Sequence, residues 1–369
     1  MVKYDFLVVG SGLFGAVFTE RAQSAGKSCL VIEKRAHIGG NVYTENINGI
    51  EVHRYGAHIF HTDNRDIWEY VNHFAEFNSF INSPLANYKE KIYNLPFNMN
   101  TFNQMWGVTS PDEAKKLIAA QIRSHFTPDP SNLEEQAINL VGTDIYKKLI
   151  KEYTEKQWGR PCRELPPEII KRLPVRFMYD NNYFNSQYQG IPKNGYTDMI
   201  RNMLGKAEIE FNTDYLKNRE YWDRQANLTL YTGAADAFYG YRFGALEYRS
   251  LRFETEELQT DNYQGNAVIN FTDALTPYTR IIEHKHFMPD APVIPHTIIS
   301  REYSLTWKIG EEAYYPIGDT KNLSIYAKYK ALMENEERVL FGGRLASYQY
   351  LDMDKTVENA IVLRSVNTP

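Results

Sequence analysis

The distribution of apolar residues near the start of the chain predicts a strand, a helix and a second strand. A continuous apolar run over residues 4–9 is typical of a buried strand, and residues 15–25 have helical periodicity. The following stretch, "SCLVIEKR", predicts a second parallel strand that ends at Glu33. Together these segments predict a βαβ unit.

The middle of the chain, over residues 101–158, follows a helical pattern. Ser110 is the expected N-cap of one helix, and Glu113 closes a capping box with it. Ser131 and Glu134 predict a second capping box at the start of another helix. We therefore expect a helical insertion in the middle of the chain.

Polar and apolar residues alternate after Tyr248, as in "YRSLRFETEEL" and "GNAVINFTD". This alternation predicts an antiparallel sheet that forms the wall of a cleft. The last segment, "RVLFGGRLASYQYLDMDKTVENAIVL", returns to a strand, a glycine turn and a helix. Because it is similar to the closing half of the opening unit, it predicts a discontinuous nucleotide-binding domain with other domains inserted into it.

Charge argues against a general nucleic-acid or membrane-surface binder. The 369 residues carry 41 Lys and Arg against 46 Asp and Glu, and no block of like charges is present. No segment is long enough to span a bilayer, and the first apolar run is broken by glycines, which argues against a signal peptide. Cys29 and Cys162 have neither a disulfide framework nor a zinc spacing, so we expect a reducing compartment.

Aromatic residues make up 14% of the chain, including 27 Tyr. This content suits a cleft that stacks on a flat ligand or a sugar, and it suits equally well aromatic cores between strands. Composition alone does not separate the two interpretations.

Three glycines spaced G-x-G-x-x-G, at Gly10, Gly12 and Gly15, follow the first predicted strand and open the first helix. Such a turn lets the backbone approach a pyrophosphate closely, while the helix offers its N-terminal N–H groups to the negative charge. Glu33 ends the second strand, where a carboxylate binds ribose hydroxyls. The combination predicts dinucleotide binding.

A second glycine turn, in "EKRAHIGGNVYT", indicates which dinucleotide is bound. Gly39 and Gly40 just past the acid resemble the FAD-binding pattern of glutathione-reductase and amine-oxidase type enzymes. The alternative is a pair of turn glycines with no ligand. We expect FAD rather than a nicotinamide cofactor.

Two histidines and three arginines lie at positions where they could bind a metal ion or a phosphate. His58 and His61 have the spacing of metal ligands on one helical turn, but no carboxylate or cysteine cluster accompanies them, and no metal is expected. Arg172 and Arg176 flank Pro174 in an expected loop, either as solvated surface or as a phosphate clamp. Arg280 lies in an apolar, aromatic strand and therefore needs an anionic partner.

Long motifs over essentially the whole chain resemble those of the bacterial UDP-galactopyranose mutases. They include "VVGSGLFGAV", "EKRAHIGGN", "YGAHIFHT", "YTEKQWG", "RLPVRF", "PYTRIIEH" and "GGRLASYQYLDMD". The resemblance implies a homodimeric cytoplasmic enzyme that interconverts UDP-galactopyranose and UDP-galactofuranose with no net redox change, by attack of reduced-flavin N5 on sugar C1. The furanose product supplies surface polysaccharides, and the flavin reductant is unidentified.

Site residues are assigned by matching the family's motifs position by position. Catalytic roles fall to Arg172, Arg280 and His58. Cofactor binding falls to Gly10, Gly12, Phe14, Gly15, Glu33, Gly39, Gly40, Asn41, His58, Ile59, Gly343, Arg344, Tyr350, Asp352 and Met353. Substrate binding falls to Asn82, Tyr153, Trp158, Arg172, Tyr183, Asn270, Arg280, Tyr315 and Tyr350.

The resemblance further implies how these residues act. Arg172 on a mobile loop and Arg280 on a fixed strand hold the UDP pyrophosphate, and Tyr153 stacks on uracil. Leu149 stands where some relatives carry an aromatic residue in the uracil pocket. A pyrophosphate is already a good leaving group, so the protein needs charge stabilisation more than a general acid.

The expected fold is α/β, with three domains. They are a discontinuous Rossmann-like FAD-binding domain (1–78, 191–243 and 337–369), a helical domain (98–170) and an antiparallel-sheet substrate domain (79–97, 171–190 and 244–336). Two rival functions share these features. One is an FAD-dependent oxidase or desaturase, and the other is a nucleotide-sugar-binding flavoprotein without turnover.

Overall fold

The computed structural model describes residues 3–170, 173–289 and 294–366. The chain divides into two compact units: unit 1 comprises residues 1–79, 186–248 and 307–369, and unit 2 comprises residues 80–185 and 249–306. The expected helical insertion and most of the expected antiparallel sheet therefore fall in one unit. The division into three domains stays a prediction.

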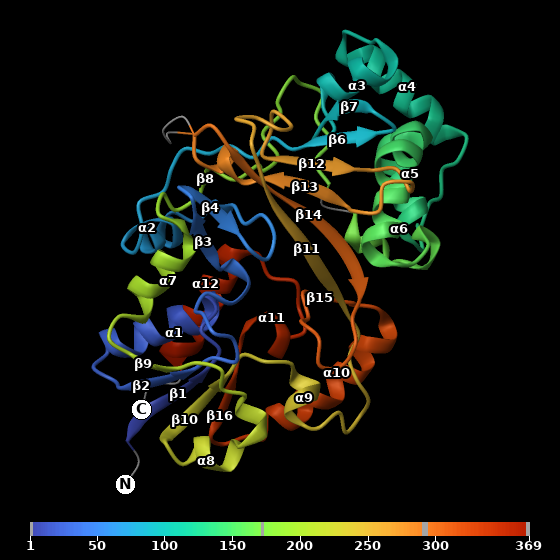
Figure 1. Ribbon diagram of the computed structural model, residues 1–369. Helices are drawn as coiled ribbons and strands as arrows, with labels where there is room; N and C mark the ends of the chain where they lie inside the picture. Colours follow the sequence, from blue (N-terminus) through green and yellow to red (C-terminus); the bar gives the residue numbers. More distant parts are fainter. Residues whose placement is uncertain (1–2, 171–172, 290–293, 367–369) are drawn as a thin grey trace. The chain divides into compact units, whose positions relative to one another are not determined.

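Unit 1 is built on a parallel sheet with the strand order β16-β10-β1-β2-β9 (Figure 1). Its strands are β1 (Tyr4–Val9), β2 (Cys29–Ile32), β9 (Glu208–Glu210), β10 (Ala226–Tyr231) and β16 (Val339–Phe341). Parallel strands covered on both faces are apolar along their length. The fully buried strand β2 follows this rule, and the predicted βαβ unit is present.

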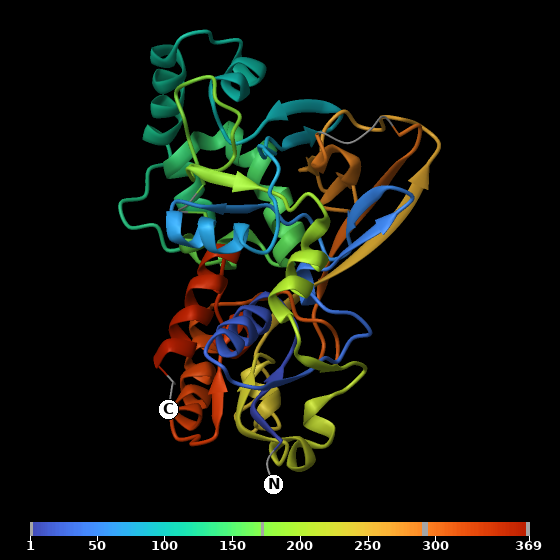
Figure 2. The ribbon, with the colours of Figure 1, turned by 90° about the vertical axis from the view of Figure 1, so that its left-hand side faces the viewer.

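Helices of unit 1 pack around this sheet. Figure 2 shows the first helix, α1, beside the last helix, α12, which come from opposite ends of the chain. The helices are α1 (Leu13–Ser24), α2 (Arg65–Asn72), α7 (Gly195–Leu204), α8 (Arg219–Asp223), α9 (Ala235–Phe238), α10 (Thr320–Met333), α11 (Gly343–Ala346) and α12 (Met353–Val366), and the short 3-10 turns are η1 (Gly40–Val42) and η5 (Tyr215–Lys217). The predicted closing strand, glycine turn and helix are thus confirmed as β16, α11 and α12.

Short strands complete unit 1. They are β3 (Thr44–Ile47), β4 (Ile50–His53), β5 (Phe60–Thr62), β8 (Tyr188–Gly190) and β15 (Tyr315–Pro316). β3 pairs with β4, and β5 pairs with β8, both antiparallel.

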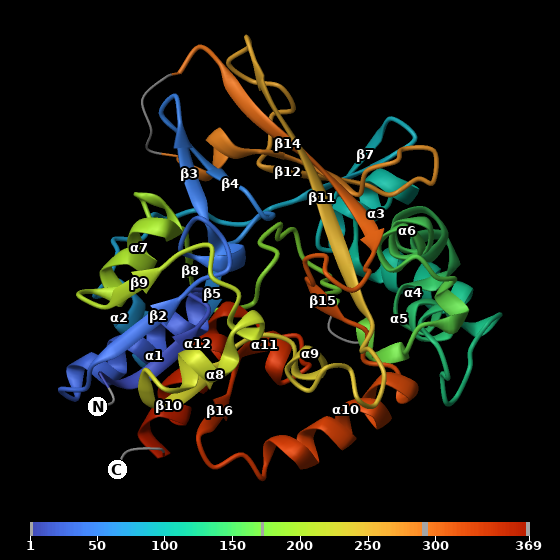
Figure 3. The same cartoon turned by 60° about the horizontal axis from the view of Figure 1, so that its bottom comes forward.

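Unit 2 contains a largely antiparallel sheet with strands in the order β11-β14-β13-β12-β6-β7, in which only β12 and β6 run parallel. Figure 3 shows β11 and β14 side by side over most of their length. The strands are β6 (Leu85–Tyr88), β7 (Lys91–Asn94), β11 (Tyr248–Leu258), β12 (Val268–Phe271), β13 (Arg280–Glu283) and β14 (Thr297–Thr306). The antiparallel sheet expected after Tyr248 is confirmed.

Helices of unit 2 enclose a core of their own. They are α3 (Met99–Trp106), α4 (Pro111–Arg123), α5 (Leu133–Ile145), η2 (Tyr146–Lys151), α6 (Glu152–Trp158), η3 (Cys162–Glu164), η4 (Pro167–Ile169) and η6 (His284–Phe287). Their core includes Phe97, Phe102, Ile118, Leu133 and Ile145, all buried. The helical insertion predicted from the periodicity is therefore present.

The two predicted capping boxes differ in outcome. The box of Ser110 and Glu113 at the start of α4 is confirmed. The second prediction, with Ser131 as cap and Glu134 as its partner, is wrong by one residue. Asn132 is the N-cap of α5 and accepts from the Glu135 N–H, while Ser131 donates to the Glu135 carboxylate.

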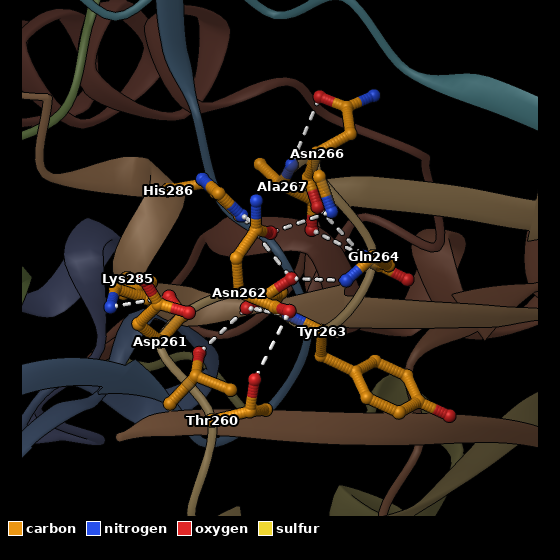
Figure 4. A network of polar contacts seen from close by, with 12 residues as sticks. Thr260, Asp261, Asn262, Tyr263, Gln264, Asn266, Ala267, Lys285 and His286 are labelled. Atoms are coloured by element: carbon orange, nitrogen blue, oxygen red, sulfur yellow. Dashed lines mark hydrogen bonds and ion pairs between the residues drawn. The ribbon is translucent and has the colours of Figure 1, made fainter. Parts of the chain in front are cut away.

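One end of the unit 2 sheet is closed by a polar network (Figure 4). Glu283, at the end of β13, is buried and accepts hydrogen bonds from the Tyr263 and Gln264 N–H groups and from Thr297 Oγ1. His286 Nε2 lies 3.2 Å from the same carboxylate. The network fixes the β11–β12 connection against β13.

Both cysteines are buried and free of disulfides. Within the described residues, no helix combines the length and the apolar character that a membrane crossing requires.

Candidate functional site

The first glycine turn of unit 1 is built for close approach to a ligand. Gly10 adopts φ +102°, and a Cβ on Gly15 would lie 2.0 Å from the Gly10 carbonyl oxygen. Both positions therefore require glycine. Gly12 is the N-cap of α1 and no side chain caps that helix, so its first N–H groups and the positive end of the helix dipole can bind an anion.

The second glycine turn packs against the first. The Gly39 N–H donates to the Ser11 carbonyl oxygen at 3.0 Å, and a Cβ on Gly40 would lie 3.0 Å from the Gly12 Cα. Gly39 and Gly40 both have positive φ. Two turns far apart in the sequence thus form one cradle of glycine backbone without side chains, which fits a dinucleotide.

Glu33 joins the strand β2 to this cradle. Its side chain is buried; Oε2 accepts from the Ser11 N–H at 2.9 Å and from Ser11 Oγ at 2.6 Å, and Oε1 accepts from the Arg35 N–H at 2.9 Å. A carboxylate has about four lone-pair sites, so it can still accept from ribose hydroxyls. Glu33 therefore both braces the turn and keeps acceptor capacity.

Sequence reasoning did not single out Arg35. Its guanidinium lies over the Tyr55 ring and donates to Asn41 Oδ1 at 3.0 Å and to Glu312 Oε2 at 2.6 Å. Its Nη1 is buried without a hydrogen-bond partner among the described residues. A buried donor in this state suits a ligand oxygen. The only sequence signal is its position two residues after Glu33.

A third glycine turn, before α11, completes the cradle from the C-terminal end of the chain. A Cβ on Gly342 would lie 2.3 Å from the Phe14 ring, and Gly343 has φ +84°. Arg344 donates to the Leu351 carbonyl oxygen at 2.8 Å, and its guanidinium lies 4.9 Å from the Tyr350 ring centroid.

Tyr315 and Tyr350 lie together, with ring centroids 5.9 Å apart, and Arg344 lies over both rings. Tyr350 is 58% exposed. Three of the predicted site residues are thus brought together in unit 1.

His58 and Ile59 lie in an irregular segment directly before β5, and His61 lies in β5, so the hypothesis of two histidines on one helical turn is wrong. Nδ1 of His58 is 2.7 Å from the Gly56 carbonyl oxygen, and Ile59 is buried. His61 instead lies 3.1 Å from Ser186 Oγ, and burial lowers its pKa, opposed by the charge of Asp352 just before α12. Among the described residues, no group of His, Cys, Asp and Glu has the arrangement of a metal site.

In unit 2, three polar residues stand in a row across three neighbouring strands. Asn270 on β12 is directly opposite Arg280 on β13, which is directly opposite Glu302 on β14. Arg280 Nε lies 2.9 Å from Glu302 Oε1, and the Glu302 side chain is buried. Glu302 is thus the anionic partner that Arg280 needs.

Asn270 adds an unused acceptor to this row. Its Oδ1 is buried and has no hydrogen-bond partner among the described residues. Sequence reasoning missed Glu302 because its pairing depends on the register of β13 and β14, which no local motif reveals.

Tyr153 on α6 shares the electrostatic environment of this row. Burial raises the pKa of its phenol to about 12, with the positive charge of Arg280 opposing and Glu302 and Tyr183 adding to the shift. The Tyr183 N–H donates to the Asn82 carbonyl oxygen at 2.8 Å, and Asn82 is buried. The structure therefore brings Tyr153, Tyr183 and Arg280 into one neighbourhood.

Trp158 at the end of α6 packs on the core of unit 2, as does Leu149 in η2. Arg172 lies outside the described residues. Arg176 is bonded within its own segment, to Asp180, Asn182 and Asn185. These bonds brace the segment that carries Arg176.

The predicted cofactor residues and most of the predicted substrate residues lie in different units. The cofactor residues Gly10, Gly12, Phe14, Gly15, Glu33, Gly39, Gly40, Asn41, His58, Ile59, Gly343, Arg344, Tyr350, Asp352 and Met353 lie in unit 1. The substrate residues Asn82, Tyr153, Trp158, Tyr183, Asn270 and Arg280 lie in unit 2.

Comparisons with known proteins agree with these features. A family model described as UDP-galactopyranose mutase matches residues 148–350, and one described as NAD(P)-binding Rossmann-like domain matches residues 8–74. The chain is 41% identical to the dTDP-fucopyranose mutase of Escherichia coli, with 96% of each chain covered. It is also 41% identical to a probable UDP-galactopyranose mutase of Klebsiella pneumoniae, with 98% of this chain and 94% of that one covered.

A solved structure of reduced UDP-galactopyranose mutase has the same fold. It superposes with a TM-score of 0.78 at 13% identity, over 99% of this chain and 94% of that one. The predicted α/β fold with a Rossmann-like domain is therefore confirmed.

Proposed function

The chain belongs to the UDP-galactopyranose mutase family of isomerases, with a Rossmann-type flavin-binding domain, and we propose that it interconverts UDP-galactopyranose and UDP-galactofuranose without net oxidation or reduction. The observation that carries this proposal is the row of Asn270, Arg280 and Glu302 beside Tyr153. An arginine fixed by a buried carboxylate and surrounded by polar groups suits a pyrophosphate.

We propose FAD as the cofactor. The glycine cradle, the carboxylate of Glu33 and the buried Nη1 of Arg35 provide backbone space, acceptors and a donor for such a dinucleotide. Reduced FAD would supply the nucleophile that attacks sugar C1. Phe14, Asn41, His58, Ile59, Gly343, Arg344, Asp352 and Met353 are the further residues proposed to hold it.

We propose that the substrate residues act on the diphosphate and on the base. Arg280 neutralises charge as the pyrophosphate leaves and returns, which lowers the barrier most where charge develops. Arg172 is proposed to do the same, and the hydroxyls of Tyr183, Tyr315 and Tyr350 are proposed to donate to the diphosphate oxygens. Tyr153 stacks on uracil, whereas Trp158, Asn82 and Asn270 lie toward the sugar.

We further propose a cytoplasmic homodimer whose flavin is reduced by a partner of unidentified nature. The free, buried thiols of Cys29 and Cys162 are consistent with a reducing compartment. The furanose product would supply a cell-surface polysaccharide.

A second candidate substrate has a specific observation in its favour. The relative from Escherichia coli, as similar as the one from Klebsiella pneumoniae, is named for dTDP-fucopyranose. Both candidates are nucleotide-diphosphate hexoses, and both require the same ring contraction. They differ in the base and in the sugar.

The test is incubation of purified holoenzyme with UDP-galactofuranose and, separately, with dTDP-fucofuranose, each with and without dithionite. Chromatography of the sugar nucleotides is expected to show the UDP-pyranose only after reduction. Faster conversion of the dTDP sugar would assign the second substrate. Stoichiometric loss of reductant would instead indicate an oxidoreductase, and no conversion of either sugar would contradict the mutase proposal.

A further inference from the structure

Lys156 lies on α6 with its ammonium group surrounded by main-chain oxygens. Nζ donates to the carbonyl oxygens of Phe271 at 2.9 Å, Asp273 at 2.9 Å and Thr276 at 2.8 Å. Phe271 is the last residue of β12, and Asp273 and Thr276 belong to the connection between β12 and β13. An ammonium group has three N–H donors, and each donor of Lys156 is hydrogen-bonded to one of these main-chain oxygens.

A second contact on the same helix supports the first. Glu152 lies one turn before Lys156, on the same face of α6. Its Oε2 accepts from the Ala274 N–H at 2.7 Å. The connection is itself a closed turn, because Asp273 Oδ1 accepts from the Leu275 and Thr276 N–H groups at 3.0 Å each. α6 therefore holds a rigid turn at two points.

The held elements are the ones that carry the proposed substrate residues. Asn270 and Arg280 stand at the two ends of the connection, directly opposite each other in the ladder. Tyr153 and Trp158 lie on either side of Lys156 in α6. The other end of β13 is held by Glu283, which accepts from the N–H groups of Tyr263 and Gln264, two residues labelled in Figure 4. The Lys156 contacts thus hold α6 against the end of this strand pair that carries Asn270 and Arg280.

Burial of the Lys156 ammonium group carries a desolvation penalty. Burial lowers the pKa of Lys156 to about 8, opposed by the charges of Asp273 and Glu152. A neutral side chain in a purely structural helix-to-turn contact would avoid this desolvation. The three directed bonds instead fix the connection in one orientation.

We propose that Lys156 is a positioning residue for substrate binding. It locks the β12–β13 connection onto α6, so that Arg280 and Asn270 on one side and Tyr153 and Trp158 on the other form one preorganised wall for a nucleotide diphosphate. This inference rests on the proposed function. It predicts that a residue without substrate contact controls nucleotide affinity.

The experiment compares FAD-loaded wild-type enzyme with Lys156→Met, Lys156→Arg, Glu152→Ala and the control Lys147→Met, an exposed lysine of the neighbouring turn. Calorimetric titration with UDP is expected to show about ten-fold weaker binding for Lys156→Met and about three-fold weaker binding for Glu152→Ala. KM should rise with little change in kcat, and flavin content should match wild type. Arginine should restore part of the affinity, and the control should bind as wild type does.

The outcomes separate the two proposals. Wild-type enzyme that neither binds UDP nor converts a nucleotide sugar contradicts the proposed function. Wild-type enzyme that is active, with Lys156→Met and Glu152→Ala lowering the melting temperature but not the UDP affinity, overturns the positioning role. Should Lys156→Met fail to fold, Glu152→Ala and Lys156→Arg decide the question alone.

Discussion

At the scale of single residues, Arg280 is the side chain on which the proposed chemistry depends most. Its Nε lies 2.9 Å from Oε1 of the buried Glu302 carboxylate, an ion pair that holds the positive charge in place before substrate arrives. Preorganised charge of this kind acts where charge develops, because no reorganisation is needed during the reaction. A flexible, solvated arginine would contribute less.

Replacing Arg280 by alanine is therefore expected to lower turnover roughly a hundred-fold, an effect of about 2–4 kcal/mol on the barrier. Arg280→Lys should recover little, because a point charge does not reproduce the bidentate fork. Flavin content should stay at the wild-type level, since Arg280 lies in unit 2 and the glycine cradle in unit 1. Initial rates and flavin absorbance check this; near-normal rates in Arg280→Ala would place the phosphate clamp elsewhere.

A second residue prediction concerns Gly15. A methyl group there would meet the Gly10 carbonyl oxygen at 2.0 Å, so Gly15→Ala must displace the turn that we propose binds FAD. We expect purified Gly15→Ala to contain little flavin. Gly318→Ala is the matched control, because its Cβ would meet nothing within 4 Å. Full flavin occupancy in Gly15→Ala would show that the cradle is not the cofactor site.

Residues whose role follows from local spacing could be predicted from the sequence, and others could not. Gly10, Gly15 and Glu33 lie close together in the sequence, within the predicted βαβ unit, so their arrangement could be predicted from local spacing. Arg35 acquires its role from Glu312, far along the chain, and Glu302 from the register of two strands. Such pairings are set by tertiary packing, which leaves no local signal.

At the scale of elements, the same contrast appears at helix starts. Ser110 and Glu113 cap α4 as predicted, whereas Asn132 replaces Ser131 at α5. Adjacent Ser and Asn both make good caps, and the downstream Glu pair offers a partner in either register. The pattern therefore predicts that a helix starts there, but not at which of the two residues.

The polar end of β13 leads to a pH prediction. Burial alone would raise the pKa of Glu283, but hydrogen bonds from His286, Tyr263, Gln264 and Thr297 lower it from 4.5 to about 2. The folded pKa is below the unfolded one, so Glu283 stabilises the fold above pH 4.5, and that contribution is lost as pH falls toward 2. Its size is on the order of 3 kcal/mol.

Urea unfolding at pH 7 and pH 3 checks this. Glu283→Gln should be markedly less stable than wild type at pH 7, and the difference should shrink at pH 3. Glu164→Gln, at an exposed position in η3, is the control and should match wild type at both values. An equal loss of unfolding free energy at both pH values would mean that side-chain packing, and not the charge of Glu283, stabilises this end of the sheet.

At the scale of the whole molecule, chain order and spatial order differ in a way that the sequence only partly reveals. The parallel sheet of unit 1 takes β1 and β2 from the start of the chain and β16 from near its end. The returning strand, glycine turn and helix were recognisable from their pattern. The three-residue strand β9 was not, because so short a run carries no measurable periodicity.

The last prediction concerns the enzyme as a whole and rests on the proposed chemistry. Because the flavin acts as a nucleophile and returns unchanged, activity should require reduced flavin yet consume no reductant per turnover. Photoreduced, anaerobic holoenzyme without free reductant should therefore convert many equivalents of sugar nucleotide while its absorbance spectrum stays that of reduced flavin. Oxidised holoenzyme under the same conditions is the control and should be inactive. Re-oxidation of the flavin in proportion to product would assign an oxidoreductase, and equal rates from oxidised enzyme would remove the flavin nucleophile from the mechanism.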